Sequence, residues 1–188
     1  MKYNIYPIAY FEDELQILLT KDKKLLQTTN NNIVNYIDKT LNININEDNI
    51  LSRTNIQDNK ISENITVIIL INLENAHKIK NTDSYLWFNK KIAQTFIPKN
   101  ESKEIDNIIT LLNERFTLYG LYGIKPLIPK KFTSKSITAQ VNNMFGIHMK
   151  NNNIKRDYQD QINIIGKDKS NPGRPLWVFE LKERTEKK

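Results

Sequence analysis

The sequence predicts a mixed α/β (α+β) protein, with a layered N-terminal domain followed by a small helix-turn-helix domain that ends in a β-hairpin. Up to Phe116, short apolar runs rich in β-branched residues alternate with amphipathic helical repeats. The stretch 117–129, with two glycines and two prolines, then interrupts this pattern. The net charge changes there too, from −1 over residues 1–120 to +8 over residues 121–188.

These observations predict three parts: a domain over 1–120, a second over 125–182, and a frayed tail at 183–188. No apolar stretch reaches the roughly 18 residues that a membrane span needs, and the first residues do not resemble a signal peptide. The absence of cysteine excludes disulfides, thiolate zinc sites and cysteine nucleophiles. We therefore expect a cytoplasmic protein that does not associate with membranes.

The first elements are expected to be two strands around a polar turn at Glu12–Glu14, since Ile17–Leu19 is a continuous apolar run suited to a buried strand. An amphipathic helix should follow, with Asn30–Asn32 as candidate N-caps. Its apolar positions recur at helical spacing: Ile33, Val34, Ile37 and Leu41.

The pattern is lost around 52–62, which indicates a loop or a ragged strand. The run from Ile65 to Leu73 is almost wholly apolar and predicts a central strand with both faces covered. A short strand or turn with Trp87 and Phe88 comes next, and we expect these rings in the core. One helix should then close the domain, with a single apolar stripe of Ile105, Ile108, Ile109, Leu112 and Phe116.

The C-terminal module should begin with a helix that Thr133 or Ser134 caps and Gly146 ends, with its apolar face at Ile137, Val141 and Met144/Phe145. After a turn at 147–149, a second helix is expected over 150–165, because Ile154, Tyr158, Ile162 and Ile165 recur at spacings of four, four and three. A charged turn over 166–175 and a strand at Leu176–Leu181 complete a winged-helix order.

The second helix of a helix-turn-helix lies in the DNA major groove and offers its exposed side chains to bases and phosphates. Asparagine and glutamine can pair with adenine, and arginine with guanine, whereas lysine more often contacts phosphate. The alternative is an ordinary solvated face in an asparagine-rich protein. The exposed positions are expected to be Asn152, Asn153, Lys155, Arg156, Gln159 and Asn163.

The turn of the hairpin has the character of a DNA-binding wing. Gly173 permits a backbone conformation that other residues avoid, and Pro172 and Pro175 stiffen the chain on both sides. An arginine held there, Arg174, could enter a minor groove or bind phosphates, although an ordinary polar hairpin is the alternative. The candidate DNA-binding residues are Lys135, Asn153, Lys155, Arg156, Gln159, Lys167, Lys169 and Arg174.

The chain contains three motifs, namely Leu127–Pro129 with Phe132 and Thr133, Asn153–Arg156, and Gly173–Phe179. Together they resemble motifs of the Nudix-related transcriptional regulators (the NrtR family). The family's entry into its C-terminal module is similar to Leu127–Pro129 with Phe132 and Thr133. Its recognition-helix motif is similar to Asn153–Arg156, and its closing motif to Gly173–Phe179. The resemblance is specific over 127–181 and loose before that, where Trp87 and Phe88 stand for the family's "WF" pair.

The resemblance implies a Nudix-like α/β/α sandwich followed by a winged helix that binds specific sequences of double-stranded DNA. It also implies a homodimer, formed through the first domain, and sensing of a metabolite such as an ADP-ribose-like effector. The N-terminal domain departs from the family's catalytic relatives, because it has no glycine before Gly120 and no R-E-x2-E-E sequence. Its acids in that region are Asp38, Glu47 and Asp48. We expect no catalysis, no metal and no cofactor.

Two other functions remain open at this point. The protein could be a vestigial regulator whose N-terminal domain serves as a protein-interaction module in a transcription complex. It could also be a Nudix-type pyrophosphatase with relocated metal ligands, in which case Glu47 or Asp48 would be needed for turnover. The two histidines, His77 and His148, lack the spacing of metal ligands, and Trp177 is expected in the core.

Overall fold

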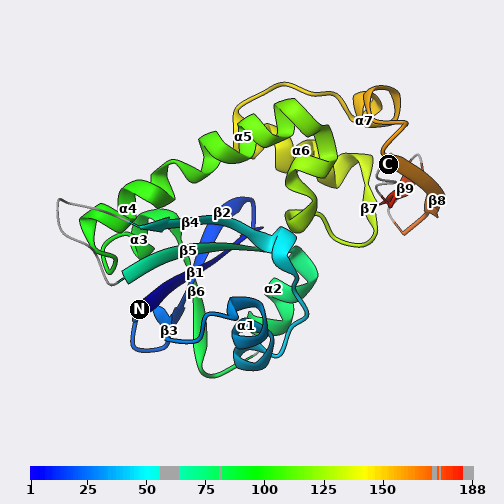
Figure 1. Cartoon of the computed structure of the whole chain (residues 1–188). Helices are drawn as coiled ribbons and strands as arrows, with labels where there is room; N and C mark the ends of the chain where they lie inside the picture. The colour runs from blue at the N-terminus through cyan, green and yellow to red at the C-terminus, as the bar shows by residue number, and fades with distance from the viewer. Residues whose placement is uncertain (56–63, 81, 171–172, 174, 184–188) are drawn as a thin grey trace, which may run out of the picture. The chain divides into compact units, whose positions relative to one another are not determined.

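The computed structural model describes residues 1–55, 64–80, 82–170, 173 and 175–183, and the chain forms two units, Met1–Ile108 and Ile109–Lys188. Helices and strands alternate in the first unit, whereas helices lead and a small sheet closes the second (Figure 1). The structure is therefore mixed α/β, as the sequence predicts. Arg174 and Pro172, both expected in the wing, lie outside the described residues.

The first unit is built on one mixed sheet with the order β4-β5-β1-β2-β6, to which β3 is added by pairing with β1. β1 and β5 run parallel, and the other pairs are antiparallel. The strands are β1 Lys2–Phe11, β2 Glu14–Thr20, β3 Leu26–Thr28, β4 Ile50–Asn55, β5 Asn64–Ile71 and β6 Tyr85–Asn89.

Two features of this sheet confirm the sequence analysis. β1 and β2 form a hairpin whose two turn residues, Glu12 and Asp13, have φ angles of 54° and 63°, the backbone that a tight two-residue turn requires. β5 lies between β4 and β1, and its side chains from Thr66 to Ile71 are buried on both faces. The apolar run was correctly predicted as an interior strand.

Helices cover both faces of the sheet. On one face, α1 (Ile33–Leu41) and α2 (Leu73–Lys80) share a buried apolar cluster with β1, β2 and β5. On the other face, α4 (Lys99–Asp106) places Glu101 against Asn4, whose Nδ2 donates to Glu101 Oε1 at 2.6 Å. Asn4 neighbours the clustered Ile5 on β1, and adjacent side chains of a strand point to opposite faces. The result is an α/β/α sandwich, to which α3 (Lys90–Ala93) and the short helix η1 (Glu47–Asn49) are added.

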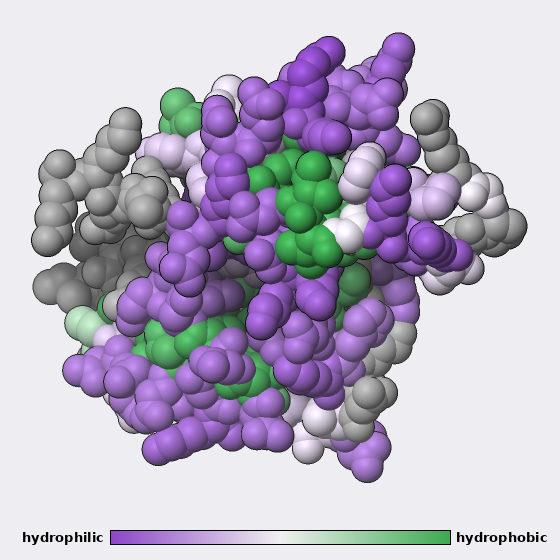
Figure 2. Space-filling view, turned by 90° about the vertical axis from the view of Figure 1, so that its right-hand side faces the viewer, coloured by the Kyte–Doolittle hydropathy of each residue, from purple (hydrophilic) through white to green (hydrophobic). Residues whose placement is uncertain are grey.

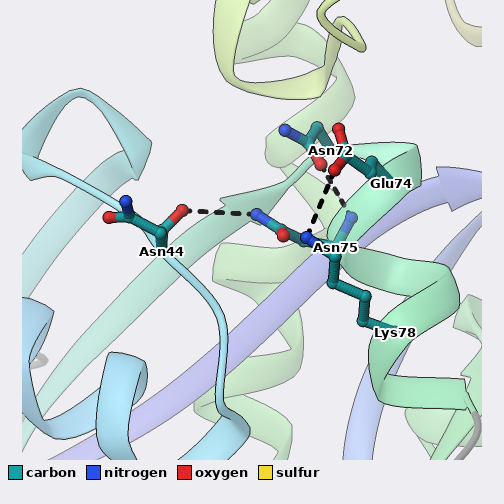
Figure 3. Close-up of polar contacts among 5 residues, drawn as sticks. All are labelled: Asn44, Asn72, Glu74, Asn75 and Lys78. Carbon is teal, nitrogen blue, oxygen red and sulfur yellow. Dashed lines mark hydrogen bonds and ion pairs between the residues drawn. The ribbon is translucent and has the colours of Figure 1, made fainter.

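α1 agrees with the prediction, since Asn32 caps it by accepting a hydrogen bond from the Asn35 amide at 3.0 Å. The sequence analysis missed α2. Asn72 caps α2 by accepting from the Asn75 amide at 2.9 Å, and the buried Asn75 side chain donates to the Asn44 carbonyl at 3.3 Å (Figure 3). These contacts fasten the loop after α1 to the start of α2. Trp87 packs against the apolar cluster, as expected.

The second unit continues as α5, η2, β7, α6, α7, β8 and β9, and its three strands form a sheet with the order β7-β9-β8. Their bounds are α5 Ile108–Tyr119, η2 Gly120–Leu127, β7 Phe132–Thr133, α6 Ser134–Phe145, α7 Asn151–Asp157, β8 Ile162–Asp168 and β9 Leu176–Leu181.

The single helix predicted to close the first domain is instead two helices, α4 and α5, which are separated at Asn107. The division between the units falls at Ile108, earlier than the boundary predicted near residue 120. α5 belongs with the second unit because the Phe116 ring packs against Phe145 at 5.4 Å and Tyr158 at 5.7 Å between ring centroids. The glycines of η2 thus lie within a packed unit.

α6 agrees with the prediction at both ends. Thr133 and Ser136 form a reciprocal capping box, and Gly146 ends the helix in a left-handed conformation. Its inward face is made by Ile137, Val141 and Met144, the positions that the helical spacing indicated.

The prediction of a second helix over 150–165 was wrong for its C-terminal half. α7 ends at Asp157, and Ile162 begins strand β8. The Gln161 side chain accepts from the Leu121 amide at 2.8 Å and donates to the Tyr119 carbonyl at 3.1 Å, which fixes the turn after α7. The β-branched residues Ile162, Ile164 and Ile165 suit an extended strand. The helical spacing of Ile162 and Ile165 from Tyr158 was therefore coincidental.

Candidate nucleic-acid interface

The candidate site is a face of the second unit made by α7, the start of α6 and the strand β9. These elements enclose a shallow hollow of about 340 Å³. Amide, hydroxyl, cationic and aromatic side chains line the hollow, a mixture suited to nucleic acid. The lining residues are Ser134, Asn151, Asn152, Lys155, Arg156, Gln159, Trp177 and Phe179.

The turn between α6 and α7 sets the position of α7. Asn142 of α6 donates from Nδ2 to the Met149 carbonyl at 2.9 Å, and its Oδ1 accepts from the Met149 amide at 2.8 Å. The fully buried Ile154 is the apolar anchor of α7. One side chain of α6 and one of α7 therefore hold the short helix, so that its exposed residues face outward together. Sequence analysis did not identify Asn142.

The sequence analysis expected Trp177 in the core, and this prediction was wrong. In the structure 37% of the surface of Trp177 is exposed. It stands two residues before the buried Phe179 on β9, so both rings point to the same face of the sheet. The Lys155 ammonium lies 4.8 Å and the Lys167 ammonium 4.4 Å from the centroid of the Trp177 ring. Both distances are within the range of cation–π contacts.

Arg156 is exposed and paired with its neighbour. Its Nε donates to Asp157 Oδ1 at 2.6 Å and its Nη2 to Asp157 Oδ2 at 3.1 Å. This hydrogen-bonded pairing lowers the pKa of the Asp157 carboxyl and raises that of the Arg156 guanidinium. The Asn153 amide accepts from Arg156 Nη2 at 3.0 Å and donates to the Lys150 carbonyl at 3.2 Å in the orientation that satisfies both of its polar atoms. Asn153 is only partly exposed and helps to hold Arg156.

Three other predicted residues, Lys135, Gln159 and Lys169, are exposed and lie on other elements. Lys135 lies in the first turn of α6, and Lys169 follows β8. Gln159 lies in the turn after α7, so the prediction that it belongs to the helix was wrong, yet it still lines the hollow. Gly173 has a φ of 122°, the kind of backbone conformation that the sequence analysis expected there. The position of Arg174 is not described.

Of the eight candidates, four are brought together at the hollow or on its tryptophan: Lys155, Arg156, Gln159 and Lys167. The structure adds residues that sequence analysis did not select, namely Ser134, Asn151 and Trp177. Strand alternation places Trp177 on the same face as Phe179, two positions on, but no sequence signal indicated that its ring would be exposed there. The predicted Asn163 lies on β8 and not on a helix.

Hydrophobic side chains are also exposed near this face. Figure 2 views the side of the molecule on which β8 and β9 are drawn in Figure 1, and hydrophobic patches interrupt a mostly hydrophilic surface. Ile164 and Ile165 of β8 are 46% and 39% exposed. In the part of the chain that the structure describes, β8 pairs with β9 alone, so these two side chains belong to an edge strand.

The acids of the N-terminal unit that were considered as metal ligands lie in α1 and in η1. Asp38 accepts a hydrogen bond from the Ile45 amide at 2.9 Å and so orders the loop after α1. Glu47 and Asp48 form the first turn of η1. Within the described ranges, no three His, Asp or Glu side chains are grouped as metal ligands would be. The helices described in the chain also do not combine the length and apolar composition of a membrane span.

No protein-family model and no curated protein matches the sequence. Solved structures do match its fold over nearly the whole chain. NrtR from Shewanella oneidensis, crystallised with a 27mer DNA, has a TM-score of 0.71 at 12% identity, covering 97% of this chain and 93% of NrtR. A second structure of that protein has a TM-score of 0.65 at 11% identity, with coverages of 96% and 93%.

A MutT/nudix family protein from Enterococcus faecalis is also similar, with a TM-score of 0.64 at 16% identity over 96% of this chain and 87% of the other. At these identities the matches establish the fold alone. The chain therefore has the Nudix-related fold of these proteins, extended over both of its units.

Proposed function

We propose that this protein is a transcription regulator that binds specific sequences of double-stranded DNA through the face around α7. The observation that carries the proposal is the gathering of Lys155, Arg156 and Lys167 on one face of a unit that is strongly basic. The overall fold match to NrtR, which was crystallised with DNA, supports the same function.

In this proposal the second unit is a winged helix. Its element order and its sheet order, β7-β9-β8, support that assignment. α7 would enter the major groove, and the β8–β9 hairpin would follow the neighbouring backbone. Asn151, Asn152 and Gln159 are the amides available to bases at this face.

Arg156 would exchange its partner when DNA binds. In the free protein Asp157 neutralises it through two hydrogen bonds, and both side chains are solvent-accessible. A guanine edge or a phosphate offers the guanidinium the same two-acceptor geometry. Asp157 would then lie unpaired near the DNA backbone, whose negative charge repels it. Binding is therefore favourable only where Arg156 gains DNA contacts that compensate for the loss of its pairing with Asp157. The arrangement favours specific over non-specific binding.

We further propose that two copies act together through the first unit, so that two α7 helices reach two half-sites of one operator. We also propose that the first unit binds an ADP-ribose-like effector and that the protein is cytoplasmic. We propose that the protein is not an enzyme. The lack of an R-E-x2-E-E sequence and the use of Asp38 in a loop hydrogen bond support this.

Variants of the face test the proposal. DNA affinity should be measured by fluorescence anisotropy over a series of salt concentrations for the parent, Lys155→Met, Arg156→Met and the control Lys39→Met. Lys39, in the last turn of α1, gives the same loss of charge in the other unit. Removing one cation that binds a DNA phosphate should reduce the slope of log K against log salt by about 0.9. If Lys39→Met and Lys155→Met behave alike, the face does not bind DNA.

A second candidate function is a protein-interaction module in a transcription complex. The exposed Ile164 and Ile165 on edge strand β8 favour it. DNA binding that is weak, insensitive to salt and unchanged in Arg156→Met would support this function over the first.

A further inference from the structure

We propose that Trp177 is a positioning residue, which holds Lys155 and Lys167 as a paired phosphate contact on the DNA-binding face. The inference rests on the proposed function, because it assigns a role within the same site. It also makes a claim about the free protein, which can be tested without DNA.

The Trp177 ring stands on β9 next to a packed pair of aromatic rings and is itself partly exposed. On the same face of β9, Phe179 is fully buried and packs against Phe132 with 6.0 Å between ring centroids. Trp177, two residues closer to the hairpin turn, extends past this packed region into the hollow. A ring in that position presents π surface to side chains arriving from other elements.

Two lysines from different elements meet at this ring. Lys155 comes from α7 and Lys167 from β8, with ammonium-to-centroid distances of 4.8 Å and 4.4 Å. The ring quadrupole attracts each ammonium, which offsets the repulsion between two like charges held close together. Trp177 therefore links the proposed recognition helix to the hairpin through their cations.

The pairing of β8 with β9 is arranged so that a lysine meets this ring. Ile164 pairs with Phe179, but Gly166 then pairs with Val178, so the register shifts by one residue at Ile165. As a result Lys167 stands directly opposite Trp177. If Ile165 instead paired with Val178 and the register did not shift, Gly166 would be opposite Trp177 and Lys167 would point to the other face of the sheet.

The two lysines differ from Arg156 in what holds them. Asp157 holds Arg156 and neutralises it, whereas an aromatic ring leaves the charge of a lysine available. Within the described residues no ion pair joins either lysine to a carboxylate at 4.0 Å or less. The ring thus fixes two full positive charges at the edge of the hollow. A pair of DNA phosphates can bind both ammonium groups while they keep their contacts with the ring, so little side-chain ordering remains to be done on binding.

The test compares Trp177→Leu with Trp177→Phe and Lys155→Met in the full chain. DNA affinity is measured over a series of salt concentrations, and thermal unfolding confirms that each variant is folded. Trp177→Leu should bind at least about fivefold more weakly than the parent at fixed salt, because binding must then order two lysine side chains that the ring no longer holds. Its salt slope should be unchanged, because both lysines still reach phosphates. Lys155→Met should lower the slope by about 0.9.

Trp177→Phe should recover most of the affinity, since phenylalanine keeps a π face for the lysines. In the DNA-free parent, NMR should show the side-chain protons next to the Lys155 and Lys167 ammonium groups shifted upfield by the ring current. These shifts should vanish in Trp177→Leu.

Three results would overturn the inference: parent-like affinity in Trp177→Leu, a Trp177→Phe variant as weak as Trp177→Leu, or no upfield shifts in the free parent. The failure of the proposed function is recognised separately, as a parent protein with no salt-dependent DNA binding. In that case the phosphate role also fails, while the NMR shifts still report whether Trp177 holds the lysines.

Discussion

Replacing Asn142 by alanine should loosen the turn that positions α7. The Asn142 amide makes two hydrogen bonds with the Met149 backbone, at 2.8 Å and 2.9 Å, from a part-buried position. Each such bond contributes about 1 kcal/mol net, so the two together contribute about 2 kcal/mol. Alanine is the better helix former by up to about 0.6 kcal/mol, which offsets part of the loss. The net destabilisation should be about 1.4 kcal/mol.

Asn143 provides a matched control in the same helix. It is exposed, so Asn143→Ala should show only the gain in helix propensity, up to about 0.6 kcal/mol. Denaturant unfolding of the two variants would measure the difference, which should be about 2 kcal/mol. Amide hydrogen exchange in Asn151–Asp157 should be faster in Asn142→Ala alone.

In a domain of this size the loss in Asn142→Ala corresponds to a fall in Tm of about 5–10 °C for the second unit. The reasoning would be refuted if Asn142→Ala and Asn143→Ala had equal stability, or if α7 exchanged at the parent's rate in both. Either result would mean that the turn does not depend on the Asn142 side chain.

Two further predictions concern the cores of the units. Burial raises the pKa of the Glu101 carboxyl above its ordinary value of 4.5, although the hydrogen bond from Asn4 acts in the opposite direction. The stability of the first unit should therefore fall as the pH rises above about 4.5 and through the raised pKa. Glu101→Gln should remove this dependence on pH. In thermal unfolding, the stability of the variant relative to the parent should increase between about pH 4 and pH 8. A difference in stability that stayed constant with pH would contradict the raised pKa of Glu101. At Gly123 an added Cβ would lie 2.1 Å from the Arg115 carbonyl oxygen, so Gly123→Ala should destabilise the second unit by about 1–3 kcal/mol or more in denaturant unfolding. Gly166→Ala, where an added Cβ meets nothing within 4 Å, is the control and should be nearly neutral.

Elements defined by local pattern could be predicted from the sequence. α1 and α6 have apolar residues at helical spacing and capping side chains at their starts, and their structures agree. β5 was predicted because its run of β-branched residues suits a strand covered on both sides. In these cases local preference and tertiary packing favour the same structure.

The errors arose where long-range contacts decide the structure. α7 and β8 share isoleucines at spacings that fit a helix, and only pairing with β9 and the Gln161 contacts make the second half a strand. α2 is short and lacks a strong apolar repeat, so its cap at Asn72 was not recognised.

The candidate site was predictable in composition but not in geometry. Lys155 and Arg156 were found because they follow an apolar anchor on a basic segment. Their different partners, Trp177 and Asp157, depend on strand register and on the exposure of the aromatic ring, which the sequence pattern does not determine. The position of Lys167 depends on the register shift at Ile165.

The central claim is sequence-specific binding of double-stranded DNA, and it is tested most directly by selecting bound fragments from sheared genomic DNA at about 0.15 M salt. The account predicts recovery of a palindromic motif, with half-sites about 10 base pairs or a multiple of that apart. The motif should disappear in Arg156→Met and persist in the control Lys39→Met. Uniform recovery of fragments without a motif would contradict sequence-specific regulation and leave only non-specific affinity.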